Sequence, residues 1–247
     1  MILKCGEIFL FSVAPEKILN SKGKEFCHIV TVNSEIFSYA HEVSRLKKIL
    51  LSTVNTIDGR ILQWICKIFY PFYEIKKISG ADLIYKISEW CLSNSKELFL
   101  LGATEESNKN AQLQLKRTFP GLKVYGFSPE FCDYPFNSEW NKKVLEEIKA
   151  IRPEYLVVCF GPIKQEFWIH ENEANLKKMG VKFAYGLGGT IDFVSGAKKR
   201  APRWIQWVGG EWFFRFLSEP KNRFKRTLIM FKMFYYAVKT RKKILEV

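Results

Sequence analysis

Short apolar runs alternate along the chain with segments whose apolar residues recur every three or four positions. The first pattern predicts buried strands and the second amphipathic helices. The predicted strands cover 28–32, 52–57, 97–101, 123–127, 155–160 and 181–187. This alternation is typical of a mostly parallel sheet with helices on both faces, so we expect an α/β, Rossmann-like core.

The segments between these strands carry helical periodicity. Asn33 or Ser34 can cap a helix whose apolar stripe continues from Ile36 to Leu50. Further helices are predicted over 83–90 and 139–151. Two more are expected, one that follows Gly102 and ends at Phe119, and one that begins near Phe167 and ends near Gly180. Beyond Gly196, closely spaced aromatic and basic residues replace this alternation. We therefore expect a sheet domain over 1–197 and a helical appendage over 198–247.

Polar residues and glycines follow the predicted strands. They are Asn33, Asp58, Gly59, Gly102, Gly161, Gly188 and Gly189. In an open α/β sheet, ligands bind at this edge because helix N-termini and backbone N–H groups gather there. The spacing of a dinucleotide fingerprint is absent, and glycine at a strand end also serves ordinary turns.

The appendage carries most of the charge. From Lys198 onward there are fourteen Lys and Arg against three Glu, a net +11 of the chain's formal +14. Large aromatic residues are interleaved with these charges. The combination suits a membrane surface with anionic headgroups. Nucleic acid and a simple solvated face are the competing interpretations of a basic tail.

Composition narrows the class of protein. A hydrophobic fraction of 47% over 247 residues excludes wholesale disorder. The six cysteines are scattered without a C-x-x-C pair, which favours buried thiols in a reducing compartment over structural zinc or disulfides. The apolar run 9–14 is too short for a signal peptide, and 228–238 is too short to span a bilayer. A membrane contact would therefore be peripheral.

Four short motifs follow one another along the chain. They are Thr31-Val-Asn33-Ser-Glu35, Gly161-Pro-Ile-Lys-Gln165-Glu166, Gly186-Leu-Gly-Gly189-Thr-Ile-Asp192 followed by Arg200-Ala-Pro202, and Glu211-Trp-Phe-Phe-Arg215. Together they resemble the WecG/TagA/CpsF family of bacterial glycosyltransferases (glycosyltransferase family 26), from about Thr31 to about Arg226. The resemblance implies transfer of a sugar from a UDP-sugar to an undecaprenyl-diphosphate-linked saccharide at the cytoplasmic face of the membrane. The pathway would be cell-surface polysaccharide synthesis: teichoic acid, capsule or exopolysaccharide.

Asp58 is the expected catalytic base, because it matches the Asp of the family's Asp-Gly motif. Glycosyl transfer needs a carboxylate to take the proton of the attacking acceptor hydroxyl. An Asp before a Gly also serves as an ordinary turn residue. Arg60 stands where the family usually has small residues, and it could help to hold a diphosphate.

The resemblance implies substrate-binding roles for further residues. Thr31 and Asn33 would bind sugar hydroxyls, although Asn33 can also be a helix cap. Gln165 would bind a sugar hydroxyl or a diphosphate oxygen, because we see no packing reason for a Gln-Glu pair there. Lys77 stands where the family often has Arg, and it would offset the charge growing on the leaving UDP.

The expected nucleotide pocket consists of Gly102, Gly161, Gly188, Gly189 and Asp192, with glycine N–H groups near the diphosphate and Asp192 on ribose or uracil. The family's Gly-Tyr-Phe element near the donor is replaced by a segment that begins Gly126-Phe127.

A diphosphate clamp is expected from Arg215, Arg223 and Arg226 in the appendage, because the fork of Arg donors suits phosphate. Arg215 matches the family position well, and the other two align loosely.

No cofactor and no metal are expected, since the chain has no D-x-D motif and the family works without one. The reaction would then be metal-independent, and with the family resemblance we expect it to be inverting. The resemblance leaves the donor sugar open among N-acetylmannosamine, its uronic acid, glucose and galactose. A homo-oligomer also stays open, as do two alternatives to the enzyme: a membrane-docked pseudoenzyme, and a basic nucleic-acid-binding protein.

Overall fold

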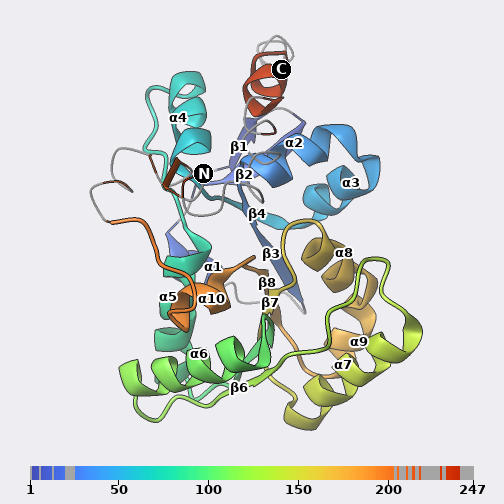
Figure 1. The fold of residues 1–247 in the computed structure, drawn as a ribbon. Helices are drawn as coiled ribbons and strands as arrows, with labels where there is room; N and C mark the ends of the chain where they lie inside the picture. The colour runs from blue at the N-terminus through green and yellow to red at the C-terminus, as the bar shows by residue number, and fades with distance from the viewer. Residues whose placement is uncertain are drawn as a thin grey trace. The chain divides into compact units, whose positions relative to one another are not determined.

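The computed structural model describes residues 2–5, 7–12, 14–19, 26–202, 205, 210, 213–214, 217, 229 and 232–239 (Figure 1). The eight strands are ordered β1-β2-β4-β3-β8-β7-β5-β6 in one sheet, which is parallel in all its described pairs except β1–β2. The prediction of a mostly parallel α/β sheet is confirmed. The chain forms two compact units: the first holds 1–14, 31–79 and 199–247, and the second holds 15–30 and 80–198.

The strands of the second unit are parallel and are buried among its helices. They are β3 (Cys27–Val32), which continues into the first unit, β8 (Phe183–Gly186), β7 (Tyr155–Cys159), β5 (Leu98–Gly102) and β6 (Val124–Phe127). The register aligns Gly102 with Cys159 and Val158 with Gly186. The carboxyl ends of three neighbouring strands therefore lie at one edge, as the sequence predicted.

Helices cover both faces of this sheet (Figure 1). On one face, α7 (Ser138–Ile151), α8 (Lys164–Glu171) and α9 (Glu173–Lys178) form a core with side chains such as Leu156 and Val158. The remaining helices of the unit are α1 (Pro15–Leu19), α5 (Gly80–Ser93), α6 (Glu105–Thr118) and α10 (Thr190–Val194). Polar contacts tie α5 to the other face, because Trp90 Nε1 donates to Tyr155 Oη at 2.7 Å.

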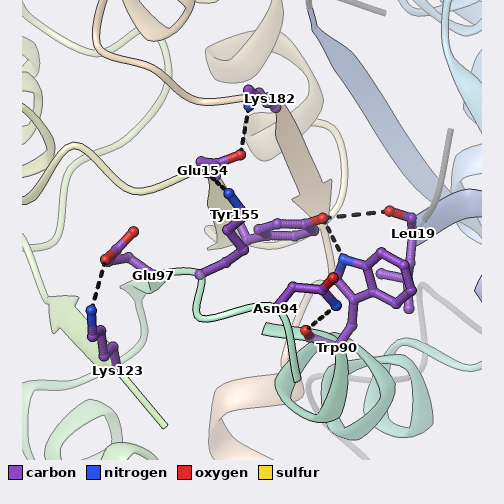
Figure 2. A network of polar contacts seen from close by, with 9 residues as sticks. Leu19, Trp90, Asn94, Glu97, Lys123, Glu154, Tyr155 and Lys182 are labelled. Carbon is purple, nitrogen blue, oxygen red and sulfur yellow. Dashed lines mark hydrogen bonds and ion pairs between the residues drawn. The ribbon is translucent and has the colours of Figure 1, made fainter. Parts of the chain in front are cut away.

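Figure 2 shows this contact together with a group of ion pairs at the amino ends of the strands. Glu154, just before β7, pairs with Lys96 and with Lys182, whose Nζ lies 2.8 Å from Glu154 Oε2. Glu97 pairs with Lys123 at 3.5 Å. Partial burial raises the pKa of Glu154, but the two lysines together outweigh it and the pKa is lowered. These ion pairs lie at the amino ends of the strands, whereas the predicted nucleotide glycines lie at the carboxyl ends.

The first unit begins with an antiparallel hairpin of β1 (Ile2–Cys5) and β2 (Ile8–Phe11), and β2 pairs in parallel with β4 (Val54–Ile57). Its helices are α2 (Ser34–Glu42), α3 (Ser44–Ser52) and α4 (Arg60–Phe69). Residues 232–239 form a further helix that contacts α2: the Tyr236 ring stacks on His41 at 4.8 Å, and Lys232 Nζ lies 2.8 Å from Glu42 Oε1.

Several sequence predictions need correction. The helices expected over 33–50 and 167–180 are each two helices, broken at Val43, which has extended backbone angles, and at Asn172. At this break the Trp168 carbonyl accepts both from the Asn172 backbone N–H at 3.1 Å and from Asn172 Nδ2 at 2.9 Å. The predictions also missed the β1–β2 hairpin and α4. The expected appendage over 198–247 stays a prediction, because most of it lies outside the described residues.

Among the residues that the structure describes, no helix is both long enough and apolar enough to cross a membrane.

Candidate active site

The first unit places Asp58 directly after β4. Its backbone N–H donates to Val32 O at 2.8 Å, so Asp58 lies beside the end of β3, where Thr31 and Asn33 are found. Asp58 is partly exposed, whereas Thr31 is buried. The two strand ends therefore bring together three of the predicted site residues.

The loop after α4 brings Lys77 to the same strand end. The Ile78 N–H donates to Ile57 O at 2.8 Å, so Lys77 precedes a bond that anchors the loop next to Asp58. Ser12, after β2, fixes the loop further back: its hydroxyl donates to Glu74 O at 3.1 Å and accepts from the Lys76 N–H at 2.8 Å. The loop that carries Lys77 is thus held at several points.

Gly59 turns the chain from β4 into α4. Its φ of +90° lies in a region that other residues rarely adopt, and a Cβ there would meet nothing within 4 Å. Glycine is therefore required at this position by its backbone angle and not by a lack of room for a side chain. Arg60 then donates from Nη1 to Gln63 Oε1 at 3.0 Å, while its buried Nε has no hydrogen-bond partner among the described residues.

Asn33 is the N-cap of α2. Its Oδ1 accepts from the backbone N–H groups of Glu35 and Ile36, both at 3.0 Å. The cap role that the sequence left open is therefore confirmed. The sugar-binding role of Asn33 stays a prediction.

The second unit gathers three glycines with positive φ at the carboxyl ends of β5, β7 and β8. They are Gly102 (+105°), Gly161 (+87°) and Gly188 (+59°). At Gly102 a Cβ would lie only 2.8 Å from Cys159 O, so both the backbone angle and the close approach require glycine there. Glycines at neighbouring strand ends allow the close backbone approach that phosphate sites use.

Gln165 and Glu166 form a buried pair between two of these loops. Gln165 is 1% exposed; its Oε1 accepts from the Gly188 N–H at 3.0 Å, and its Nε2 donates to Glu166 Oε1 at 2.8 Å. Glu166 Oε2 accepts from the Ile163 N–H at 2.6 Å. The expectation that the pair has no packing reason is therefore wrong: it joins the loop after β7 to the loop after β8.

This pair stabilises unusual backbone geometry. Ile163 has a φ of +73°, which costs a non-glycine residue about 1–3 kcal/mol, and the bond from its N–H to Glu166 is one that holds it there. Gly186 must also be glycine, because a Cβ would lie 2.8 Å from Glu166 Oε1. Gln165 and Glu166 thus position the loops, and the substrate-binding role expected of Gln165 stays a prediction.

Asp192 lies in α10 and forms a salt bridge. Its Oδ2 is 2.8 Å from Lys198 Nζ, and its backbone carbonyl accepts from the Lys198 N–H at 3.0 Å. A Cβ on Gly189 would lie 4.0 Å from the same Oδ2, so the carboxylate lies close to the predicted nucleotide glycines. Its role on ribose or uracil stays a prediction.

A pocket of about 340 Å³ opens beside the ends of β5 and β6. It is lined by Glu105, Asn108, Lys109, Gln112, Gly126, Phe127, Ser128, Glu130 and Lys143. Buried Asn108 forms its inner wall and donates from Nδ2 to Leu100 O and Gly102 O, both at 3.0 Å. A Cβ on Gly126 would lie 2.1 Å from Asn108 Oδ1, so glycine is required. The sequence pointed to Gly126 and Phe127 but gave no sign of Asn108.

Three predicted residues, Arg215, Arg223 and Arg226, lie outside the described residues. Among those described, no group of three or more His, Cys, Asp or Glu side chains could hold a metal ion. Metal independence stays a prediction.

Comparison with known proteins identifies the family. The sequence model of the family described as "Glycosyl transferase WecG/TagA/CpsF family" matches residues 11–246. The chain belongs to this glycosyltransferase family. Similar relatives come from Staphylococcus aureus strains MRSA252, MW2 and NCTC 8325, and each is named N-acetylglucosaminyldiphosphoundecaprenol N-acetyl-beta-D-mannosaminyltransferase. Each is 31% identical over 199 residues, 78% of this chain and 73% of the relative. The resemblance seen in the four motifs is thereby confirmed.

Proposed function

We propose that this glycosyltransferase moves an N-acetylmannosamine-type sugar from a UDP-sugar to undecaprenyl-diphosphate-linked N-acetylglucosamine, in the synthesis of a surface polysaccharide such as teichoic acid. The observation that carries the proposal is the set of relatives named for that transfer, which match 78% of the chain. The placement of Asp58, Thr31, Asn33 and Lys77 at adjoining strand ends supports it.

Asp58 is proposed as the general base. An acceptor hydroxyl attacks the anomeric carbon of the donor, Asp58 takes the hydroxyl proton, and the bond to UDP breaks with inversion at that carbon. The partial exposure of Asp58 is consistent with access to a substrate. Lys77, whose loop is anchored beside Asp58, would offset the negative charge that develops as UDP leaves.

The second unit is proposed to hold the nucleotide. The loops after β5, β7 and β8 would present backbone N–H groups to the diphosphate, apart from that of Gly188, which Gln165 already binds. The buried pair Gln165–Glu166 would keep the loops after β7 and β8 in place. The 340 Å³ pocket is proposed to hold the remainder of the nucleotide, because its lining combines the amides of Asn108 and Gln112 with Phe127. Its two lysines are balanced by Glu105 and Glu130. Positive charge from lysines and arginines would replace a metal ion.

The acceptor would reach the enzyme at the inner face of the cell membrane. An undecaprenyl diphosphate keeps its lipid in the leaflet, so a chain with a formal net charge of +14 is suited to meet it at an anionic surface. The arginines 215, 223 and 226 are proposed to bind the acceptor's diphosphate.

The test is release of UDP by the purified protein from a panel of UDP-hexoses, with and without undecaprenyl-diphosphate-linked N-acetylglucosamine. Asp58→Asn should lower the acceptor-dependent rate by about 10²–10⁴-fold. Glu146→Gln, an exposed carboxylate on α7, should leave the rate unchanged. Equal release by Asp58→Asn would remove Asp58 as the base. Release from no donor would contradict the proposed transfer and favour the pseudoenzyme.

A further inference from the structure

Helix α4 exposes two large apolar side chains to water. Leu62, Ile65 and Cys66 are buried in the first unit, whereas Trp64 and Ile68, one turn apart, are exposed. Lys67 is exposed next to them, so the outer side of α4 combines two apolar side chains with one lysine. Exposed apolar side chains that continue into further exposed aromatic rings mark a surface that contacts an apolar partner.

The turn that follows α4 extends this exposed apolar surface. Phe72 is 96% exposed, and the adjacent Tyr73 is also exposed. The flanks of the turn are fixed: the Tyr70 hydroxyl donates to Lys4 O at 2.7 Å, and Gln63 Nε2 donates to Ile75 O at 2.6 Å. Two aromatic rings are thus held in water by an anchored loop.

The same segment is positively charged. Residues 60–77, which we call the α4–loop segment, contain four basic residues against the single acid Glu74, and two of the basic residues, Lys67 and Lys76, are exposed. Glu74 lies 3.6 Å from Lys76 Nζ in an exposed ion pair, which contributes little on its own. Segments that lie in the headgroup region of a bilayer typically combine aromatic residues with lysine.

We propose that the α4–loop segment docks on an anionic lipid leaflet, with Phe72 and Tyr73 inserted among the headgroups and Trp64 and Ile68 at the surface. The charge favours this partner: an isologous contact with a second copy would bring two cationic segments together, whereas anionic lipids neutralise them. The choice of a lipid surface rests on the proposed lipid-linked acceptor. Because α4 begins two residues after Asp58, docking would bring that strand end to the leaflet.

The first experiment measures insertion at the segment itself. Phe72→Cys, in a Cys132→Ser background, is labelled with an environment-sensitive fluorophore; the other five native cysteines are buried. We expect a blue shift when the full chain meets vesicles of phosphatidylglycerol and phosphatidylcholine, and none with phosphatidylcholine alone. Leu113→Cys, an exposed apolar position on α6, is the matched control and should stay in water.

The second experiment measures binding. Phe72→Ser combined with Tyr73→Ser should weaken cosedimentation with the anionic vesicles by at least about tenfold, because two large apolar groups lose their insertion. Phe131→Ser, which removes an aromatic ring that is 89% exposed in the second unit, should leave binding unchanged. Circular dichroism of each variant checks that the fold is retained.

Two results would overturn the inference. One is a label at residue 72 that stays in water while the protein cosediments. The other is a concentration-dependent dimer, seen by light scattering, that the Phe72→Ser and Tyr73→Ser changes abolish. Neither measurement requires the sugar donor or the lipid-linked acceptor. Failed docking with sugar transfer retained would therefore refute only this inference, and docking without transfer would refute only the proposed function.

Discussion

Glu166→Gln tests whether the buried pair holds the loops after β7 and β8. The carboxylate accepts two hydrogen bonds, at 2.6 Å from the Ile163 N–H and at 2.8 Å from Gln165 Nε2. A glutamine has one acceptor oxygen and one NH₂ group, so one of these donors would face another donor. The side chain is fully buried, and water cannot easily replace the lost acceptor.

The expected loss is about 1–3 kcal/mol in the free energy of unfolding, the cost of leaving a buried donor unsatisfied. Relief of the desolvation of a buried carboxylate would offset part of this loss, so we expect the lower half of that range. The strained φ of Ile163 adds a second effect, because the loop would be free to relax once its N–H loses the acceptor. The glycines at 161 and 188 would then lose their fixed spacing.

Urea denaturation measures the first effect, and the KM for the donor nucleotide sugar measures the second. Glu173→Gln, a partly exposed carboxylate paired with Lys177 on α9, is the matched control and should change the unfolding free energy by less than about 0.5 kcal/mol. If Glu166→Gln unfolds at the same urea concentration as the wild type and keeps its KM, the pair does not hold the loops and the reasoning fails.

Three further predictions concern the sheet edges and the pocket. Gly102→Ala should lower the melting temperature more than Gly121→Ala, because both positions have positive φ but only Gly102 would place a Cβ 2.8 Å from a carbonyl oxygen. Gly126→Ala should displace Asn108 from the pocket wall and raise the KM for the donor at unchanged acceptor KM; an unchanged donor KM would separate the pocket from the donor site. The lowered pKa of Glu154 stabilises the fold above the unfolded pKa, near 4.5, and this contribution is lost as the pH falls through the folded pKa. Glu154→Gln should therefore flatten the fall in stability below about pH 5, and an unaltered acid profile would contradict the ion-pair account.

The sequence predicted the central strands well because parallel strands buried on both faces are continuous apolar runs. β5 and β7 are examples, with every residue buried. It also placed Asp58, Gly102 and Gly188 at strand ends, since a change from apolar to polar or glycine marks where a strand stops. These predictions depend only on local composition.

The features that the sequence did not predict depend mostly on contacts between distant segments. The apolar stripe over 167–179 gives no sign of the break at Asn172, where the side chain bonds to Trp168 O and accepts from Asn141 on α7. The role of Gln165 could not be read from its own helix, because its partner Gly188 comes from the next strand's loop. The hairpin β1–β2 escaped prediction because Lys4 interrupts the apolar pattern of β1, and because the apolar run over 9–14 was considered only as a signal peptide.

The first unit is assembled from segments that are made far apart in time. The His41 ring stacks on Tyr236 and Glu42 pairs with Lys232, contacts that span nearly two hundred residues. On a ribosome, α2 therefore emerges long before the helix that covers it, whereas the second unit is complete once residue 198 has been made. The second unit can therefore fold first during translation, whereas the unit that carries Asp58 must wait for residues 232–239. Premature termination would release a folded second unit and an incomplete first unit.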